Sequence, residues 1–387
     1  MGAETMNNTK YWVWLSLALG TGTRNDEILT AFPDPKKLYE ASEADRMSAG
    51  IFTKRQFEKL GETKMADAER ILATCTKYGW QIVTPDDRIY PAGLRKLVDM
   101  PLALYVDGDI SCLRGKVIIG VVGTRKPCHE SIAIARKISS DLAYAGAVVV
   151  SGGALGIDSS AHEGALIAGG KTVCVLGCGL GTDYLMENEA LRREISRSGA
   201  VVTEYPPMKP ATRYTFPERN RIISGMSHGI LVVEAGEKSG SLITAKRAAE
   251  QSRDIYAIPG SILTTAYNGV NALIRDGAKA VSGARDILAA YEVIYPERLD
   301  LGNIPDTPIT VEKPGEKRKT RTVKKQSVQG LDPDCTAVYN LFGEESLHPD
   351  EICAATGLPL SRVISVLMQL QMDDYIEIDG GKNYRLK

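Results

Sequence analysis

The sequence has little of the chemistry on which metal sites and disulfide frameworks depend. It contains seven cysteines and four histidines among 387 residues. The cysteines are odd in number and scattered, which argues against a disulfide framework and for a reducing compartment. Cys174 and Cys178 form a close pair, but no second pair of Cys or His has matching spacing. We therefore expect buried thiols there, with no metal and no cofactor.

Long apolar runs and an excess of charge are also missing. The apolar stretch Tyr11–Leu19 is too short to span a bilayer, and no positively charged segment with a cleavage site precedes it. We expect a cytoplasmic protein with no membrane association. The net charge of −1 offers no general attraction to nucleic acid. Any site for a polyanion must therefore be a local concentration of Lys and Arg.

What the sequence does have is a series of continuously apolar, mostly β-branched runs between residues 116 and 292. Apolar strands without alternation are buried on both faces of a sheet. Helical patterns separate most of the runs, so we predict an α/β fold with a doubly wound, mostly parallel sheet. The expected strands are Val117–Val122, Ala147–Val150, Thr172–Leu176, Ala200–Thr203, Ile230–Val233 and Ile255–Ile258.

The regions before this core differ from it in texture. Residues 1–79 have the pattern of short helices, as in a small helix-hairpin-helix or SAM-like domain, and a helical cap that only packs is an equal alternative. Residues 80–115 are extended and punctuated by proline, which indicates a connecting region. We assign residues 80–295 to the sheet domain as a whole.

The regions after the core are a linker and a compact tail. Residues 296–331 carry Pro305, Pro308 and Pro314 and a basic cluster, with almost no large apolar residue, so we expect disorder and favour a solvated linker over a nucleic-acid contact. Residues 332–387 predict three helices and then a hairpin, which is the winged-helix order. The third helix, Ser361–Asp373, has Arg362 as its one cation, so we favour protein contact over reading of duplex DNA. The basic cluster is Lys317, Arg318, Lys319, Arg321, Lys324 and Lys325.

Four of the expected strands end in glycine-rich or polar turns. Ligands of doubly wound sheets bind at the carboxyl ends of the strands, where these turns meet. Backbone N–H groups at such turns and at helix N-termini suit a phosphate, and an arginine such as Arg125 can donate two hydrogen bonds to one. The turns are Gly123-Thr124-Arg125-Lys126, Ser151-Gly152-Gly153, Gly177-Cys178-Gly179-Leu180-Gly181 and Ser239-Gly240-Ser241.

A segment between the fourth and fifth strands surrounds a Phe-Pro with arginines. It contains Arg213, Phe216, Arg219, Asn220 and Arg221. Arginine for phosphates and an aromatic ring for base stacking are the ingredients of single-strand binding. The alternative is a helix start with the phenylalanine in the core and the arginines in salt bridges. For the segment taken alone, that alternative is favoured.

One pair of residues has the spacing of an acid–base pair. Asp158 and His162 are four residues apart on an expected helix, so their side chains can meet. No nucleophile elbow, Walker-type lysine or metal-ligand cluster accompanies them. We therefore favour a cap for Asp158 and a packed side chain for His162, and we expect a protein that is not an enzyme.

The order of these motifs resembles the DprA/Smf family of DNA-processing proteins over roughly residues 80–280. The tail resembles the winged-helix module of many members, and the N-terminal helices resemble their SAM-like domain. The motifs are Tyr90-Pro91 with Leu94, Asp99, Pro101, Leu104 and Gly108; Val122-Gly123-Thr124-Arg125; Ser151–His162; Phe216-Pro217-Glu218-Arg219-Asn220-Arg221-Ile222-Ile223; Val232-Val233-Glu234-Ala235; Ser239-Gly240-Ser241-Leu242; Pro259-Gly260; and Gly269-Val270-Asn271.

The resemblance implies a function and a site. It implies an extended Rossmann-like domain that binds single-stranded DNA, usually dimerises, and helps load the RecA recombinase in natural transformation, without catalysis. The family's DNA pocket corresponds here to Arg125, Ser151–Gly153, Arg213 and Phe216. Arg213 stands where lysine is common, and the loop after the third strand lacks the family's Tyr-Pro pairing. The full set of expected DNA-binding residues is Gly123, Thr124, Arg125, Ser151, Gly152, Gly153, Arg213, Phe216, Arg219, Asn220, Arg221, Ser239, Gly240 and Ser241.

Two other functions remain open at this point. Phosphoribohydrolases on related Rossmann-like folds use similar glycine turns to cleave nucleoside monophosphates, and Glu234 or Asp158 would be the catalytic carboxylate here. The other alternative is a scaffold that recruits a partner through the tail and the basic linker.

Overall fold

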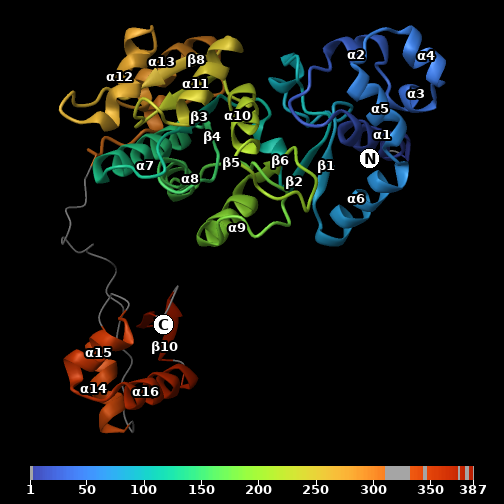
Figure 1. The fold of residues 1–387 in the computed structure, drawn as a ribbon. Helices are drawn as coiled ribbons and strands as arrows, with labels where there is room; N and C mark the ends of the chain where they lie inside the picture. Colours follow the sequence, from blue (N-terminus) through green and yellow to red (C-terminus); the bar gives the residue numbers. More distant parts are fainter. Residues whose placement is uncertain (1–2, 310–331, 343–346, 374, 380–382, 387) are drawn as a thin grey trace. The chain divides into compact units, whose positions relative to one another are not determined.

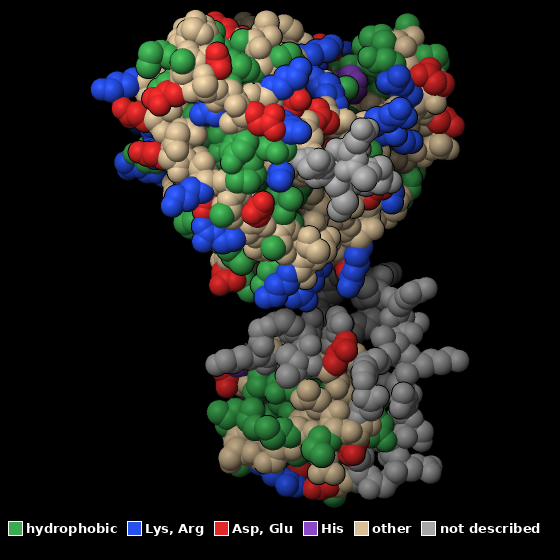
Figure 2. Space-filling model, turned by 90° about the vertical axis from the view of Figure 1, so that its right-hand side faces the viewer, with side chains coloured by type: hydrophobic (Ala, Val, Ile, Leu, Met, Phe, Trp, Pro, Cys, Tyr) green, Lys and Arg blue, Asp and Glu red, His purple; other side chains and the backbone are tan. Residues whose placement is uncertain are grey.

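The computed structural model describes residues 3–309, 332–342, 347–373, 375–379 and 383–386 (Figure 1). The chain divides into two compact units, residues 1–312 and 313–387. The basic cluster of the expected linker and the turn at residues 380–382 lie outside the described residues. On the face shown in Figure 2, Lys and Arg side chains are interspersed with Asp and Glu, as the net charge near zero leads one to expect.

The first unit is built on a nine-stranded sheet in the order β1-β2-β6-β5-β4-β3-β7-β8-β9. All pairings from β6 to β9 across the sheet are parallel, and β1 and β2 form an antiparallel edge. The predicted α/β fold and all six predicted strands are confirmed. The strands are β1 (Gln81–Val83), β2 (Leu104–Gly108), β3 (Ile118–Val122), β4 (Val148–Ser151), β5 (Thr172–Val175), β6 (Ala200–Thr203), β7 (Gly229–Val232), β8 (Asp254–Ala257) and β9 (Lys279–Ala280).

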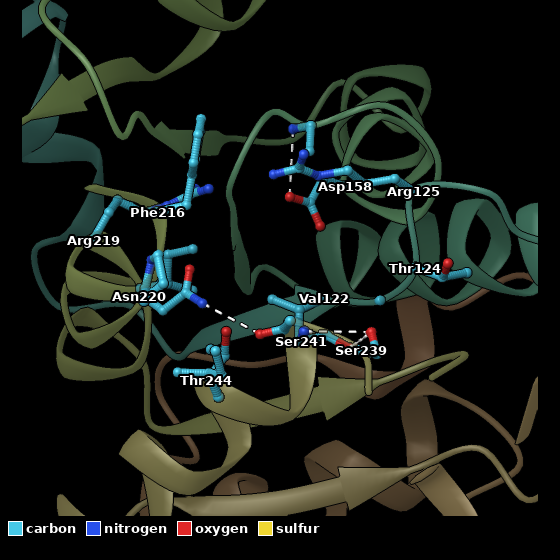
Figure 3. A pocket seen from close by; sticks show the side chains of 16 residues that line it. Val122, Thr124, Arg125, Asp158, Phe216, Arg219, Asn220, Ser239, Ser241 and Thr244 are labelled. Atoms are coloured by element: carbon cyan, nitrogen blue, oxygen red, sulfur yellow. Dashed lines mark hydrogen bonds between the residues drawn. The ribbon is translucent and has the colours of Figure 1, made fainter. Parts of the chain in front are cut away.

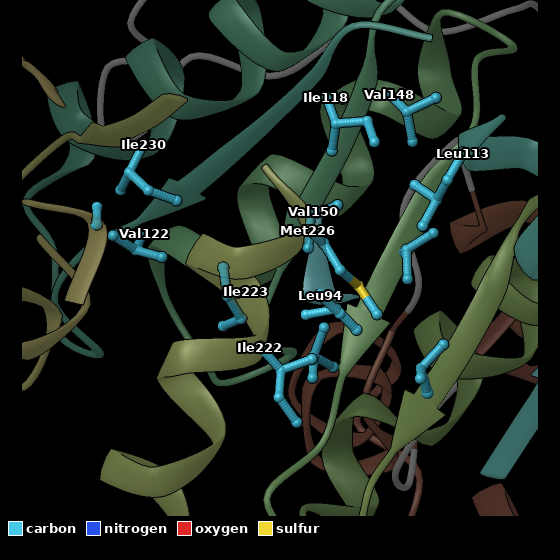
Figure 4. Packing of buried hydrophobic residues seen from close by; sticks show 14 of the residues in the cluster. Leu94, Leu113, Ile118, Val122, Val148, Val150, Ile222, Ile223, Met226 and Ile230 are labelled. Carbon is cyan, nitrogen blue, oxygen red and sulfur yellow. The ribbon is translucent and has the colours of Figure 1, made fainter. Parts of the chain in front are cut away.

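Helices cover both faces of this sheet and explain why its strands are apolar throughout. Successive side chains of a strand point to opposite faces. Ile118 and Val122 of β3 lie in one hydrophobic cluster, whereas Ile119 and Val121 lie in the other. Figure 4 shows the first cluster, in which Met226 of a covering helix lies among the strand residues. The helices are α7 (His129–Tyr144), α8 (Ile157–Ile167), α9 (Glu189–Ser198), α10 (Thr215–Met226), α11 (Ser241–Glu250), α12 (Asn268–Arg275) and α13 (Ala284–Ile294).

The connecting region before the core is part of the sheet, which the sequence pattern did not reveal. β1 pairs with β2, and β2 pairs with β6, both antiparallel. Leu104, Tyr105 and Val106 are fully buried because N-terminal helices cover the face opposite the core. The two strands are only three and five residues long and are separated by prolines, so their local pattern is weak.

The N-terminal region is helical, as predicted, with Trp12, Trp14 and Leu15 buried in its own cluster. Residues 54–78 form two helices, because Thr63 adopts an extended conformation and closes the first. Ser42 and Thr53 form capping boxes that start two of the short helices. The helices are α1 (Ala3–Leu19), α2 (Asp26–Ala31), α3 (Pro35–Glu40), α4 (Glu43–Ser48), α5 (Lys54–Glu62) and α6 (Met65–Tyr78).

The expectation of disorder from residue 296 onward is wrong for its first part. Leu299, Leu301 and Ile304 are buried in the cluster on the α7 face of the sheet. The backbone N–H of Asp300 also donates to the carbonyl of Ala145 at 3.0 Å. Three apolar side chains spaced among polar ones are enough to attach this segment to the core.

The tail has the predicted winged-helix order. Its helices are α14 (Pro333–Leu341), α15 (Pro349–Thr356) and α16 (Leu360–Met372), followed by the antiparallel pair β10 (Ile376–Asp379) and β11 (Asn383–Leu386). Arg362 of α16 pairs with Asp332 at 2.5 Å and with Asp334 at 2.7 Å. In the part of the chain that is described, no single helix is long and apolar enough to cross a membrane, and only α15 and α16 together, bent by 112°, meet that criterion.

A buried ionic cluster joins the connecting region, the sheet and α10. The Arg221 side chain is 2% exposed; its Nη2 lies 2.5 Å from Oε2 of Glu204, and its Nε lies 3.4 Å from Oδ2 of Asp99. Burial raises the pKa of Glu204, and the Arg221 guanidinium opposes that shift. Charges removed from water in this way are tolerated only as a set, because each would otherwise be uncompensated.

We predict that Arg221→Met lowers the free energy of unfolding by about 3–5 kcal/mol, because Glu204 and Asp99 lose their buried cation. Urea denaturation at neutral pH measures this. Arg247→Ala is the matched control, since its pair with Glu250 is exposed and contributes about 0–1 kcal/mol. Equal losses for the two variants would contradict the prediction.

Candidate nucleic-acid interface

A cavity of about 300 Å³ lies at the carboxyl end of β3, between the first turns of α8, α10 and α11 (Figure 3). Elements from four parts of the sequence meet there, as the doubly wound sheet requires. Nine of the expected DNA-binding residues line it: Gly123, Thr124, Arg125, Phe216, Arg219, Asn220, Ser239, Gly240 and Ser241.

The turn after β3 is held in place by backbone hydrogen bonds. The N–H of Thr124 donates to the carbonyl of Glu234 at 2.8 Å, and its carbonyl accepts from the N–H of Ile157 at 3.2 Å. Gly123 has no room for a side chain, since a Cβ would lie 2.6 Å from Cγ1 of Ile157. This anchored turn presents Arg125 as an exposed side chain above the cavity.

Phe216 is a half-buried ring at the centre of the cavity wall. The guanidinium of Arg125 lies 5.1 Å from its centroid, and the ring of Tyr184 lies 5.2 Å away. A Cβ on Gly177 would approach the ring to 2.9 Å, so the loop after β5 closes against Phe216. The ring is therefore held between an exposed cation and a second aromatic side chain.

The arginines of the Phe-Pro segment have three different positions. Arg219 is 4% exposed; it lines the cavity, and its Nη1 donates to the carbonyl of Val175. Arg213 is exposed outside the cavity, with its guanidinium 4.7 Å from the ring of Tyr214. Arg221 is in the ionic cluster described above and does not line the cavity. The salt-bridge alternative thus holds for Arg221.

The Ser-Gly-Gly turn after β4 packs behind the cavity and does not line it. Ser151 is fully buried, and its Oγ donates to the carbonyl of Val121 at 2.6 Å. A Cβ on Gly152 would collide with the Arg219 guanidinium and lie 2.6 Å from Oδ2 of Asp158. Gly153 has a φ of +65°. The absence of side chains here makes room for Arg219 and Asp158.

The N-terminus of α11 forms the opposite wall. Ser239 Oγ lies 2.8 Å from Ser241 Oγ and 3.4 Å from the N–H of Ser241. Asn220 of α10 donates from Nδ2 to the carbonyl of Gly240 at 3.5 Å. The helix dipole and the two serine hydroxyls favour an anion at such a terminus. Ile243 and Thr244 also line the cavity; the helical spacing from Ser241 to Thr244 was the one sequence signal for them.

Asp158 and His162 do not form an acid–base pair. The ring of His162 is fully buried, and its Nδ1 lies 2.7 Å from Oγ1 of Thr172. The expected helix cap at Asp158 is wrong, because Gly156 occupies the cap position of α8; Asp158 instead lines the cavity and accepts from the N–H of Ala154, four residues earlier, at 3.4 Å. Burial raises the pKa of Asp158, and the Arg219 guanidinium opposes that shift.

Glu234, the other candidate for a catalytic carboxylate, also has a structural role. The Glu234 carboxylate is buried and accepts from the N–H of Cys128 at 3.0 Å, and the residue does not line the cavity. Within the described ranges, no group of three or more His, Cys, Asp or Glu side chains is arranged to hold a metal ion. The chemistry that the cavity does offer is cations, N–H and hydroxyl donors, and an aromatic ring.

Comparison with known proteins places this geometry in context. Residues 81–292 match the model of the family of DNA recombination-mediator protein A, and residues 322–382 match the DprA winged helix domain. Protein Smf of Escherichia coli is 32% identical over 378 residues, covering 97% of this chain and 96% of its own. DprA of Streptococcus pneumoniae is 41% identical over 206 residues, covering 53% and 72%.

Two solved structures are also similar. The crystal structure of DprA from Streptococcus pneumoniae superposes with a TM-score of 0.64 at 33% identity, covering 73% of this chain and 97% of that one. DprA from Helicobacter pylori, described for its single-stranded DNA binding mode, gives a TM-score of 0.51 at 29% identity and covers 56% and 97%.

The buried histidine predicts how stability depends on pH. Burial, with the nearby Arg219 charge, lowers the pKa of His162 to about 3, whereas an unfolded histidine titrates near 6.5. Between these values only the unfolded chain takes up the proton, so stability falls as pH decreases, by about 1.4 kcal/mol per unit. From pH 7 to pH 5, His162 should account for a loss of about 2 kcal/mol.

Urea denaturation of the wild type and of His162→Gln at both pH values isolates this contribution. The variant is expected to be less stable at pH 7 but to lose about 2 kcal/mol less on acidification. An identical loss in the two proteins would show that His162 is not a buried neutral side chain.

Proposed function

The chain belongs to the family of DNA recombination-mediator protein A, and from that premise we propose that it binds single-stranded DNA in the cavity between β3, α10 and α11. The observation that carries the proposal is the meeting of Arg125, Phe216 and the α11 N-terminus in one cavity. Each supplies a different part of what a nucleic-acid strand requires: an exposed cation, a stacking ring and the positive end of a helix dipole with its serine hydroxyls.

The proposed binding mode divides the strand between these groups. A base stacks on Phe216 and takes the place that the Arg125 guanidinium occupies without DNA. Arg125 then turns to a phosphate, and a neighbouring phosphate lies against Asn220 and the N–H groups at Ser241. Arg213, exposed beside the cavity, holds the strand as it leaves. Arg221 has no part in DNA binding, because Glu204 and Asp99 hold it in the interior.

This mode favours single strands over duplexes. Phe216 is half-buried in a cavity of about 300 Å³, so a base must leave its stack to reach the ring. In a duplex the faces of the bases are covered by their neighbours, and unstacking them costs energy. The two candidate carboxylates are engaged elsewhere, because Asp158 accepts from the N–H of Ala154 and Glu234 accepts from the N–H of Cys128. We therefore propose a binding protein and not an enzyme.

The finer parts of the proposal come from the resemblance. We propose that the chain acts in the cytoplasm as a homodimer through its Rossmann-like domain and loads RecA onto single strands during DNA uptake. For the tail, we propose contact with a protein and not with duplex DNA. Arg362, the one cation of its third helix, is already paired with Asp332 and Asp334 and so has little charge to offer a phosphate. The relative from Helicobacter pylori, described as binding single-stranded DNA, supports the core of the proposal.

Two substitutions separate the contributions of charge and stacking. Arg125→Ala should weaken binding and reduce the slope of log affinity against log salt by about 0.7, because the strand then has one fewer cation against its phosphates. Phe216→Ala should weaken binding by about 1–3 kcal/mol, because a base no longer has a ring to stack on, and should leave that slope unchanged. Fluorescence anisotropy of a labelled oligonucleotide over a range of salt concentrations measures both effects.

The controls for this pair are drawn from the same chain. Arg55→Ala removes an exposed cation from α5 and should change neither quantity. Phe216→Trp keeps an aromatic face and should retain most of the affinity. If Arg125→Ala and Phe216→Ala both bind like the wild type, the proposed site is wrong.

RecA loading is tested on single strands coated with a single-strand-binding protein. We expect the wild-type chain to shorten the lag before RecA assembles, measured by RecA ATPase activity, and the Arg125→Ala/Phe216→Ala variant to leave the lag unchanged. A lag that the wild type does not shorten would contradict RecA loading. Sedimentation of the wild type should give twice the monomer mass if it is a homodimer.

A further inference from the structure

A second cavity, of about 420 Å³, lies at the amino ends of the strands, where β3 and β7 begin, on the opposite side of the sheet domain from the first cavity. Its walls come from residues 88–96, from the segment before β3, from the end of α10 and from the segments after α11 and α13. We call it the basic cavity, because its lining contains no aspartate or glutamate and six cations: Arg88, Lys96, Arg114, Lys116, Arg253 and Arg298.

These cations have almost no partners of opposite charge. Arg298 lies 3.0 Å from the exposed carboxylate of Glu297. In the part of the chain that the structure describes, no carboxylate lies within 4.0 Å of the other five. Asp254, the first residue of β8, faces His228 and accepts from the hydroxyl of Tyr291 at 2.5 Å. Clustered cations repel one another, so this arrangement favours an anionic ligand.

The floor of the basic cavity presents donors that are already fixed in position. Nη2 of Arg253 donates to the carbonyls of Gly93 at 3.3 Å and Gly225 at 3.0 Å, whereas its buried Nε has no partner among the described residues. His228 accepts from the N–H of Ile118 at Nδ1, at 3.1 Å, so the neutral ring carries its hydrogen on Nε2. Nε2 of His228 is thus a donor that can serve a ligand, whereas Nε of Arg253 is buried.

Helix α10 connects the basic cavity to the cavity at the carboxyl end of β3. Phe216 and Asn220 at the start of α10 line the first cavity, and Met226 at its end lines the second. Twelve residues of helix span about 18 Å. A strand with the stacked spacing of a duplex, about 3.4 Å per nucleotide, needs about five nucleotides for that distance, and an extended single strand needs fewer.

We propose that the basic cavity holds the phosphates of a further segment of the same single strand that enters the first cavity. This rests on the proposed function. Six cations exceed the charge of a mononucleotide but suit the repeating phosphates of a strand. Guanidinium and ammonium groups bind phosphate oxygens, so we expect the six cations to contact the backbone of the strand. Binding there is therefore independent of sequence.

The test compares a long strand with a short one. The variant Lys96→Ala/Arg114→Ala/Lys116→Ala removes three exposed cations whose side chains make no ion pair within the described ranges. The control Lys54→Ala/Arg55→Ala/Lys64→Ala removes three exposed cations from the N-terminal helices. Affinity is measured over a range of salt concentrations for oligonucleotides of about two and about 20 nucleotides, one too short to reach from one cavity to the other and one that exceeds the span of α10.

We expect the basic-cavity variant to bind the long strand at least about tenfold more weakly than the control does at low salt. Its salt slope should fall by about 2, because each cation that is removed from a phosphate lowers the slope by about 0.7. Both variants should bind the short strand like the wild type. Because all the changed residues are exposed, we expect unchanged melting temperatures, and the single reversal Lys116→Glu repeats the test with one substitution.

Equal affinity and equal salt slope of the two triple variants for the long strand would overturn the proposal. So would loss of binding to a mononucleotide such as AMP, or to an acidic peptide, with long-strand binding intact. Failure of the proposed function gives a different result. In that case the Phe216→Ala variant binds the short strand as tightly as the wild type does.

Discussion

The position of α10 depends on the burial of Arg221 between Glu204 and Asp99. This ionic cluster ties the helix to the end of β6 and to the segment before β2, and each charge in it requires the others. Two residues earlier on the same helix, Arg219 reaches the carbonyl of Val175 and lines the first cavity. Helical geometry then places Phe216 and Asn220 at the mouth of that cavity. The proposed binding groups are rigid because a neighbouring arginine is fully removed from solvent.

The parallel sheet explains why anion-binding features occur at both of its edges. At the carboxyl edge, the turns after β3 and β7 bring Arg125 and the α11 N-terminus together. At the amino edge, segments that precede β3 and β7 bring Lys116 and His228 into the basic cavity. The chain as a whole has a net charge of −1, so these are local concentrations of charge. A strand that passes from one cavity to the other would neutralise both.

The sequence predicted the parts of this structure that depend on local pattern. The strands from β3 to β8 were predictable because burial on both faces makes them continuously apolar. Helical spacing separates Arg219 from Arg221, but it does not show that Arg221 pairs in the interior, since its partners Glu204 and Asp99 lie 17 and 122 residues earlier in the chain. The Ser151–Gly153 turn has the composition of an anion site, yet its glycines make room for side chains from α8 and α10. Basic residues in separate segments gave no local signal of the second cavity.

The most direct test of the central claim is photochemical cross-linking of the full-length chain to a single strand that carries iodo-deoxyuridine, with the attached peptide identified by mass spectrometry. A halogenated base that stacks on an aromatic ring reacts with it, so the DNA-bound peptide should contain Phe216, and duplex DNA should give little product. Cross-links confined to residues 332–387, with none in α10, would contradict the assignment of DNA binding to the cavity at the carboxyl end of β3.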